Sequence, residues 1–318
     1  MCFDRLVVSG TPSRAAGVVI PFWLDRPAAE AVEIGLIADR LGFGETWMGE
    51  MLHFDAFALG GALAVRTRQA TITVGPLALG LRDPVQMAMG VASVGVLGDR
   101  PARLALGASS PAVVENWHGR RWGGEAENLP AAVALIRDVL RGDRTDHSGR
   151  FESHGFRSAL GPQPDHITVA AWGPRMMRAA TACADRIVLN LVPVEVVRQA
   201  RASGMPMAVW LVAGVDPTPE GRAQVARQLA LYLSAPGYAE VLTAAGMNEA
   251  VTAARQGARP SELAAMLSED QIGRVAALGD QGEVVRCVDS YREAGADVMV
   301  VPVTAGDPAG QRTLSALA

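Results

Sequence analysis

The chain has 318 residues, 49% of them hydrophobic, and a formal net charge of -4. This apolar content is enough for a large buried core. The length alone suggests two domains, but α/β barrels of this size form a single one. The acidic balance and the lack of a basic stripe argue against a nucleic-acid partner and, more weakly, against an anionic membrane surface.

The three cysteines, Cys2, Cys183 and Cys287, lie far apart and form no CxxC pair. This spacing indicates neither a zinc site nor a disulfide framework, and it favours a reducing cytoplasm. The N-terminus has no basic region followed by a long apolar run, so we expect no secretory signal. The longest uncharged stretch, 84–98, is too short to span a bilayer and predicts a buried helix.

In the first third of the chain, short β-branched runs alternate with alanine-rich runs, a pattern typical of parallel α/β folds. Pro27 suits the first turn of the first helix and Gly42 suits its end, while Asp55 is a candidate N-cap of the second helix. The expected strands cover 16–21, 45–49, 70–74 and 103–106, and the expected helices cover 27–41, 57–66 and 84–97.

The alternation is interrupted between 107 and 165, which predicts an insertion after the fourth strand. One clear helix is expected at 129–140. It is followed by a pattern typical of a hairpin, with a Ser148-Gly149 turn joining 144–147 to 150–153. Trp117 in this insertion either shapes a substrate pocket or packs the insertion onto the rest of the fold.

The strand–helix alternation then resumes and continues to the end of the chain. The region 223–267 is mostly helical, with breaks at Pro236-Gly237 and Pro260. About eight strand–helix units result, and no loop has the context of a dinucleotide-binding turn, which favours one closed (β/α)8 TIM barrel over 1–318 rather than an open doubly wound sheet. The later strands are expected at 167–171, 186–191, 207–212 and 297–301, and the later helices at 175–184, 195–203 and 283–294.

Several common kinds of site have no support in the sequence. Gly42-Phe43-Gly44 precedes a strand instead of following one, so it does not fit a dinucleotide loop. No pair of histidines has helical ligand spacing, so no metal site is expected. Ser109-Ser110 lacks the GxSxG context of a hydrolytic nucleophile.

In a barrel the active site lies where the strands end, at their carboxyl ends. Glycines with small or rigid neighbours follow several of the expected strands. Such glycines either let a flat ring or a phosphate approach the backbone closely, or only form tight turns. The segments that directly follow the strands are 49–53, 75–77, 107–111, 172–175 and Asn190.

Four segments carry a family resemblance: LGFGETWMGEMLHFDAFALGGALAVRT, ITVGPLALGLRDP, RLALGASSPAVVENWHG and AAWGPRMMRAATACADRIVLNLV. In this order they resemble the bacterial luciferase-like superfamily, and the resemblance covers nearly the whole chain. GASSPAVVENWHG together with AAWGPRMM is most similar to the subgroup that uses the deazaflavin coenzyme F420. The resemblance implies an oxidoreductase that transfers a hydride between F420 and a small organic substrate. An FMN-dependent monooxygenase using O₂ and a non-catalytic flavin-binding member are the alternatives.

The resemblance also implies where the cofactor would lie. A bulge after the third strand, often with a cis peptide, supports the middle ring. The next loop faces the pyrimidine end of the ring and the polyol, and the loop after the fifth strand binds the phosphate. A proline reduces the cost of a cis bond by about 2 kcal/mol, so we expect Gly75-Pro76 to be cis. The corresponding residues are Gly75, Pro76 and Leu77, then Gly107, Ala108, Ser109 and Ser110, then Trp172, Gly173, Pro174, Arg175 and Met176, with Asn190 as a further expected contact.

The acid–base residues are less clearly defined than the cofactor cradle. Glu50 corresponds to an acidic residue that several relatives keep near the ring, where it would orient substrate or transfer a proton. Otherwise it is a carboxylate tied structurally at a strand end. The family commonly has histidine directly after this acid, but this chain has Met51. His53 either replaces that histidine or is a loop residue at the rim.

The family further implies a homodimer through the helices after the second and third strands. The segments 58–65 and 85–97 are small and apolar nearly all round, which suits helices buried on both sides.

Overall fold

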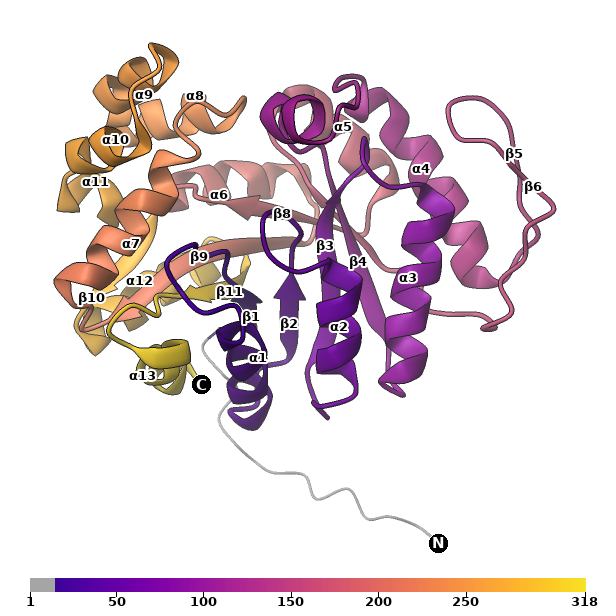
Figure 1. Ribbon diagram of the computed structural model, residues 1–318, viewed down its shortest axis with the longest axis horizontal. Coiled ribbons are helices and arrows are strands. Elements are labelled where there is room, and N and C mark those ends of the chain that lie inside the picture. Colours follow the sequence, from indigo (N-terminus) through magenta and orange to yellow (C-terminus); the bar gives the residue numbers. More distant parts are fainter. Residues whose placement is uncertain (1–14) are drawn as a thin grey trace, which may run out of the picture.

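The computed structural model describes residues 15–318, and in it eight parallel strands close into a barrel (Figure 1). The closure is complete because β11 pairs with both β9 and β1, and β9 pairs with β8. The predicted closed barrel is therefore confirmed, and the open sheet was the wrong alternative. The barrel strands in order are β1 Gly17–Ile20, β2 Glu45–Met48, β3 Thr71–Ala78, β4 Ala102–Gly107, β7 Ile167–Ala170, β8 Arg186–Asn190, β9 Met207–Val215 and β11 Asp297–Pro302.

Helices surround the barrel, and most of them follow the strand to which the sequence assigned them (Figure 1). Asp55 caps α2 as predicted, because its carboxylate accepts from the amides of Phe57 and Ala58. None of the described helices is long and apolar enough to cross a membrane. The surrounding helices are α1 Glu30–Arg40, α2 Ala56–Ala64, α3 Pro84–Leu97, α4 Glu125–Arg141, α5 Gly173–Cys183, α6 Val194–Ala200, α12 Gln281–Glu293 and α13 Gln311–Leu317.

A helical lobe follows β9 and rises beside the carboxyl ends of the strands (orange in Figure 1). Its helices break at Gly237 and begin again at Pro260, as the sequence predicted. The short strand β10, Ala276–Gly279, pairs with β9 beside the barrel and was not expected. The lobe consists of α7 Pro219–Ala230, α8 Tyr238–Leu242, α9 Asn248–Arg255, α10 Pro260–Met266 and α11 Glu269–Gly273.

Several predicted bounds were wrong. Helix α4 begins at Glu125 instead of 129, and β3 continues to Ala78 instead of 74. Helix α1 begins at Glu30 and not at Pro27, because the residues after Pro27 form tighter turns, in which the amides of Glu30 and Ala31 donate to the carbonyls three residues earlier.

The hairpin is β5 Asp146–His147 with β6 Ser153–His154, so its loop is longer than the predicted Ser148-Gly149 turn. In this register His147 lies 2.7 Å from the Asp138 carboxylate, and His154 lies 2.8 Å from the Asp146 carboxylate. Cys2 and the N-terminal segment on which the prediction of no secretory signal rests lie outside the described residues.

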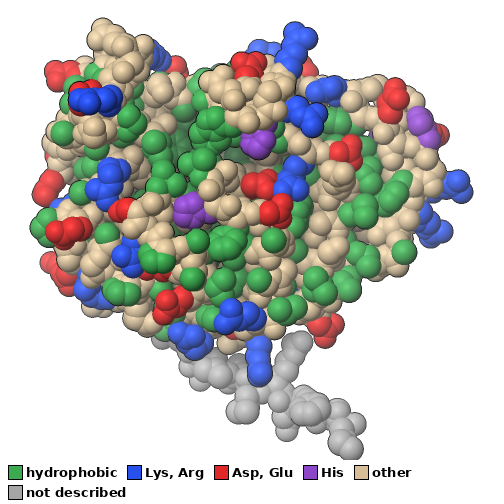
Figure 2. Space-filling view, in the orientation of Figure 1, with side chains coloured by type: hydrophobic (Ala, Val, Ile, Leu, Met, Phe, Trp, Pro, Cys, Tyr) green, Lys and Arg blue, Asp and Glu red, His purple; other side chains and the backbone are tan. Residues whose placement is uncertain are grey.

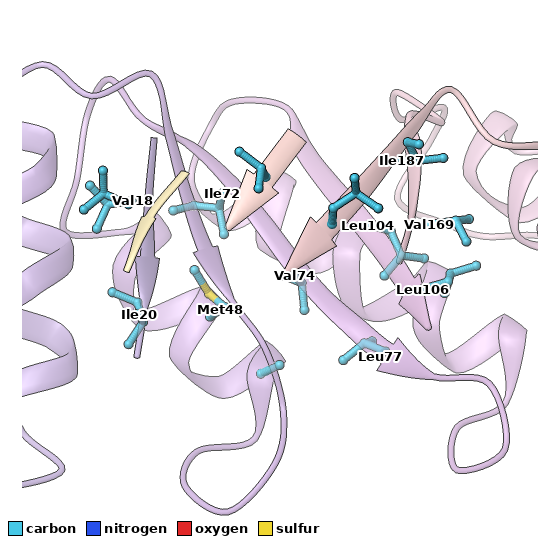
Figure 3. Packing of buried hydrophobic residues seen from close by; sticks show 14 of the residues in the cluster. Val18, Ile20, Met48, Ile72, Val74, Leu77, Leu104, Leu106, Val169 and Ile187 are labelled. Atoms are coloured by element: carbon cyan, nitrogen blue, oxygen red, sulfur yellow. The ribbon is translucent and has the colours of Figure 1, made fainter. Parts of the chain in front are cut away.

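Alternate side chains of the strands face two different cores, as the period of a strand requires. Those facing outward, such as Val18, Ile20, Ile72 and Val74, pack between the barrel and its helices (Figure 3). Those facing inward include Val19, which belongs to a second cluster shared with the helical lobe. The interior of the barrel is thus packed by a different set of side chains from the set that packs against the surrounding helices.

The inside of the barrel also contains charge, which the β-branched patterns of the strands did not predict. Glu45 accepts from Arg186 at 2.7 and 3.0 Å and from the Thr73 hydroxyl. The Arg186 guanidinium lies 5.1 Å from the ring centre of Trp47, and Trp47 meets Trp210 edge to face with centroids 5.7 Å apart. These side chains fill the barrel from the amino ends of the strands toward their carboxyl ends.

Candidate functional site

The first part of the site is a bulge in β3 between Val74 and Leu77, at the carboxyl end of the barrel. The Gly75-Pro76 peptide bond is cis, as predicted. Gly75 has φ +121°, and a Cβ there would lie 2.1 Å from the carbonyl oxygen of Ala105 on β4. Only glycine allows the two backbones to approach this closely.

Small residues on the neighbouring strands lie close beside this bulge. A Cβ at Gly107 would lie 3.3 Å from the Cβ of Pro76 and 3.6 Å from that of Ala170. Gly173, at the start of α5, has open space where a Cβ would be. We call Gly75, Gly107 and Gly173 the glycine cradle. A flat group can reach the backbone along this arc of the barrel mouth.

The start of α5 ends this arc. No described side chain caps its first turn, so its free amides face outward from the helix end. Arg175 is exposed and pairs with Glu127 of α4, and this contact holds the pKa of the Glu127 carboxyl below its ordinary value. An anion at this helix start would compete with Glu127 for Arg175.

Other residues of the predicted cofactor set lie around the cradle in different ways. Leu77 and Met176 are buried in the outer core, so only their backbone is available to a ligand. Ser109 is exposed with φ +59°, and the Ser110 hydroxyl accepts from the Val113 amide at 3.4 Å. Trp172 packs against Gly237 of the helical lobe, where a Cβ would meet its ring at 2.3 Å.

The insertion covers the loop after β4 through a different tryptophan from the one expected. The Trp122 indole donates to the Ala108 carbonyl at 3.0 Å, whereas Trp117 is half exposed. Packing of the insertion on the barrel therefore involves Trp122, and Trp117 stands outward.

Glu50 belongs to a compact ion cluster whose central residue is Arg82. Both of its carboxylate oxygens accept from Arg82, with Nε at 2.7 Å, and Arg82 also binds Asp55. The Arg82 guanidinium lies 5.2 Å from the ring centre of Phe57. Pairing with Glu50 raises the pKa of Arg82 above its ordinary value despite partial burial. The cluster ties the loop after β2 to the segment after β3.

Met51 is partly buried and His53 is exposed in the same loop. The structure thus places Glu50 and His53 in the same segment, but it gives Glu50 a permanent cationic partner. Arg82 was missed because nothing in its local sequence points to Glu50, 32 residues away.

A second part of the site lies on the opposite arc of the mouth, at the ends of β1, β8, β9 and β11. We call it the aromatic pocket. Figure 2 shows a hollow with hydrophobic walls beside the helical lobe. Aliphatic side chains of β1, β9 and β11 form part of the lining. The aromatic and amide side chains that line the pocket belong to Phe22, Trp23, Asn190, Trp210, Gln228 and Tyr232.

Asn190 joins this pocket rather than the cradle. Its amide donates to the Tyr238 hydroxyl at 3.2 Å, and the ring of Tyr238 lies 4.7 Å from that of Tyr232. Burial raises the pKa of both phenols, so both are protonated at neutral pH. The end of β8 is thereby fastened to the helical lobe.

Gln224 fixes the position of α7, which carries Gln228 and Tyr232 into the pocket. Its amide oxygen accepts from the amides of Thr304 and Ala305, and its amide nitrogen donates to Asp25. The loops after β1 and β11 therefore meet on one buried side chain. Asp25 also pairs with Arg227 on the same helix.

The pocket was missed by sequence reasoning although a signal was present. Pro21, Phe22 and Trp23 directly follow the first strand, the position where barrel active sites are built. Trp210 lies within a strand, and the lobe residues follow in helices, so only the closed fold brings them to the mouth. Among residues 15–318, no group of three His, Cys, Asp or Glu side chains is placed to hold a metal ion.

Comparison with known proteins finds relatives along nearly the whole chain. A Mycobacterium tuberculosis protein named as a candidate coenzyme F420-dependent oxidoreductase is 23% identical over 345 positions, covering 95% of this chain and 98% of its own. The F420-dependent tetrahydromethanopterin reductase of Methanopyrus kandleri superposes with a TM-score of 0.79 at 16% identity, covering 95% of this chain and 97% of that one.

An F420-dependent secondary alcohol dehydrogenase, solved with an F420-acetone adduct, gives a TM-score of 0.75 at 17% identity, with 95% and 98% of the two chains covered. The oxygenating component of 3,6-diketocamphane monooxygenase from Pseudomonas putida, solved with FMN, gives 0.65 at 15% identity, with 96% of each chain covered. These likenesses establish a shared fold. The model of the luciferase-like monooxygenase family matches residues 6–298, and the chain therefore belongs to that family.

Proposed function

We propose that the chain is an F420-dependent oxidoreductase that transfers a hydride between the deazaflavin and a small organic substrate. The glycine cradle is the observation that carries this proposal, because glycines in the bulge of β3, at the end of β4 and at the start of α5 leave backbone without side chains against which a planar ring can lie. The assignment of the M. tuberculosis relative supports F420 over FMN. When bound, the deazaflavin would supply the hydride chemistry.

The chain's own residues would bind, orient and shield the reactants. The bulge at Gly75 would support the ring, Gly107 would keep the neighbouring strand free of a side chain, and Ser109 and Ser110 would offer polar groups to the hydrophilic side of the ring. The free amides at the start of α5, with Arg175, would face the phosphate. Trp23 and Trp210 would keep water from the opposite side of the mouth.

Glu50 and His53 are our proposed acid–base residues, with different duties. Glu50 is ion-paired to Arg82 through both oxygens, which favours a role in holding the loop and its charge rather than in donating a proton. His53, the exposed imidazole of that loop, is the proposed proton-transfer group in place of the histidine that Met51 replaces.

Titration of the purified chain with F420 and with FMN, followed by fluorescence, tests the function. We expect F420 to bind at least tenfold more tightly than FMN. Arg175→Ala should weaken F420 binding by about two- to fivefold, the effect of about 0.5–1 kcal/mol at an exposed helix start. Glu127→Gln should tighten it, because Arg175 loses its competing partner.

Tight FMN binding without F420 binding would instead establish the FMN-dependent monooxygenase alternative. Failure of both cofactors to bind would contradict any flavin-type function for the glycine cradle. Unchanged F420 affinity in both Arg175→Ala and Glu127→Gln would show that the phosphate does not bind at the start of α5.

We also propose a homodimer formed through α2 and α3. Val65, Met89, Val96 and Leu97 on these helices are exposed in the single chain, Leu97 by 62%. Such a concentration of apolar side chains is typical of an interface. Leu97→Glu should convert a dimer of 33.3 kDa chains into monomers, as measured by light scattering, because it would bury an unpaired carboxylate.

Met266→Glu is the matched control, since Met266 is exposed on α10 of the helical lobe, away from both helices (Figure 1). It should leave the mass unchanged. A wild-type chain that elutes at the monomer mass would rule out the dimer.

A further inference from the structure

A cleft of about 280 Å³ lies between the helical lobe and the helices that surround the barrel. One water molecule needs about 10–15 Å³ by the same measure, so the cleft has room for a ligand of several non-hydrogen atoms. We call it the lobe cleft, and its four walls are marked by Glu195 at the start of α6, Ala245 of the helical turn η3 (Thr243–Met247), Arg274 after α11 and Cys287 of α12.

The wall on the barrel side is held in place by hydrogen bonds. Tyr291 of α12 is buried, and its hydroxyl donates to the Val192 carbonyl at 2.7 Å, which fixes the segment that leads into α6. The Ser290 hydroxyl donates to the Cys287 carbonyl at 2.7 Å within α12. Burial raises the pKa of the Cys287 thiol, so this group is neutral at neutral pH. Glu195 is therefore the charged side chain of this wall among the lining residues that the structure describes.

The wall on the lobe side is also fixed. The side-chain amide of Gln271 on α11 donates to the Gly246 carbonyl of η3 at 2.6 Å. Gly246 has φ +90°, and a Cβ there would lie 3.3 Å from Nη1 of Arg274, so the glycine leaves space for the guanidinium beside η3. Ala244 and Ala245 give this wall a small apolar surface. The lobe thus contributes one cation and an apolar surface to the cleft.

The lobe cleft has a carboxylate on its barrel side and a guanidinium on its lobe side. The Glu195 side chain is 66% exposed and lies 3.4 Å from Arg198, whereas Arg274 is 52% exposed and lies 3.1 Å from Asp270. Exposed pairs within one helix contribute little to stability, so either charge can turn to a ligand. Within the described residues Glu195 and Arg274 form no ion pair with each other. A ligand with an ammonium and a carboxylate group can therefore bridge them.

We propose that the lobe cleft is a second ligand site, which takes a small zwitterion with an aliphatic side chain, such as a leucine-type α-amino acid. The ammonium group would face Glu195 and the carboxylate would face Arg274. The aliphatic side chain would lie against Val194 of α6 and Ala245 of η3. The inference does not depend on the proposed oxidoreductase function, because none of these residues belongs to the glycine cradle.

Both sides of the lobe cleft are connected to the barrel mouth. Helix α6 follows Asn190 of β8 after a short loop, and η3 directly follows α8, which begins at Tyr238. The Asn190 amide donates to the Tyr238 hydroxyl at 3.2 Å. A ligand that bridges α6 and η3 would therefore stabilise the position of the helical lobe at the mouth.

Calorimetry or ligand-observed NMR on the full chain, without F420 or FMN, tests the ligand class. The probes are leucine, 3-methylbutylamine, which lacks the carboxylate of leucine, 4-methylpentanoate, which lacks its ammonium group, and glycine, which lacks its side chain. Leucine should bind at least about threefold more tightly than each of the others, because each of them loses one set of contacts. Leucine binding no more tightly than the others, or not binding at millimolar concentration, would overturn the proposal.

Charge variants assign the two ends of the ligand. Glu195→Gln should weaken leucine binding at least about threefold without weakening that of 4-methylpentanoate. Arg274→Gln should weaken both of these ligands without weakening 3-methylbutylamine. Glu240→Gln and Arg255→Gln break a pair of similar exposure on the lobe, outside the lobe cleft, and should leave the leucine affinity unchanged. An equal loss of leucine affinity in the two controls would contradict the proposed site.

A bulky substitution locates the binding. Ala244→Trp should fill the lobe cleft and lower the leucine affinity at least about tenfold, whereas Ala223→Trp, at an exposed position of α7, should not change it. Hydrogen exchange should show that leucine protects the amides of both 191–196 and 243–247. Wild-type leucine affinity in an Ala244→Trp variant whose thermal unfolding is normal, or protection of one segment alone, would overturn the proposal. A failed F420 titration would leave it intact.

Discussion

Replacing Glu45 with alanine should lower the free energy of unfolding by about 3–5 kcal/mol, the cost of leaving a buried charge without its partner. Arg186, which is 5% exposed, would lose two hydrogen bonds to the Glu45 carboxylate inside the barrel. It would keep its hydrogen bond to the Thr168 hydroxyl at 3.2 Å, its contact with the Trp47 ring and its approach to the Asp297 carboxylate at 3.9 Å. Urea denaturation followed by circular dichroism measures the difference.

Two further variants separate a lost ion pair from simple truncation. Glu240→Gln breaks the exposed pair with Arg255 and should change stability by no more than about 1 kcal/mol. Replacing Glu45 and Arg186 together by methionine should recover most of the loss, because both desolvated charges are removed. A Glu45→Ala variant as stable as the wild type would show that the barrel interior is hydrated.

The same pair gives the chain an acid-sensitive component of stability. Burial alone would raise the pKa of Glu45, but the bonds from Arg186 and Thr73 outweigh it and hold the pKa below its ordinary value. A carboxyl with a depressed pKa in the folded state stabilises fully above its unfolded pKa of about 4.3 and loses that contribution as the pH falls through the folded value. Glu45→Gln should therefore flatten the stability profile below about pH 4.3.

Most of the barrel could be predicted from local patterns. Each strand–helix unit has its own signal, such as the β-branched run TITV followed by the apolar helix α3, and parallel strands need no long-range information to be recognised. The Asp55 cap and the cis Gly75-Pro76 bond are also local, because they depend on a few adjacent residues. The glycine cradle could be located for the same reason, since it follows the strand ends.

The remaining features could not be predicted from local patterns, because they depend on closure of the barrel. Glu45 and Arg186 are separated by 141 residues, and neither has a neighbour in the sequence that indicates a buried pair. The aromatic pocket likewise combines Trp23, Trp210 and Tyr232 from a loop, a strand and a lobe helix. Arg82 turns Glu50 from a candidate acid into an ion-paired residue, a change visible only in three dimensions. The catalytic assignment was consequently the weakest part of the sequence prediction.

Replacing Gly107 with leucine should weaken cofactor binding at least a hundredfold, or about 2.8 kcal/mol. The leucine Cβ would lie 3.3 Å from Pro76 and 3.6 Å from Ala170, so the remaining side chain must extend into the space that the cradle leaves for a ring. Gly107 does not have a positive φ, so the backbone accepts a side chain. Fluorescence titration gives the affinity, and thermal unfolding measures any loss of stability from overpacking.

Two further variants are compared with Gly107→Leu: Gly107→Ala, which adds less volume at the same position, and Gly273→Leu, which adds leucine at an exposed position. Alanine adds only the Cβ and should have a smaller effect, so that affinity falls in the order glycine, alanine, leucine while the fold persists. Gly273 is exposed, and a Cβ added there would have no neighbour within 4 Å, so this position should accept leucine without loss of cofactor binding. A folded Gly107→Leu variant with wild-type affinity would contradict the cradle, because a ring lying against the β4 backbone cannot share that space with an isobutyl group.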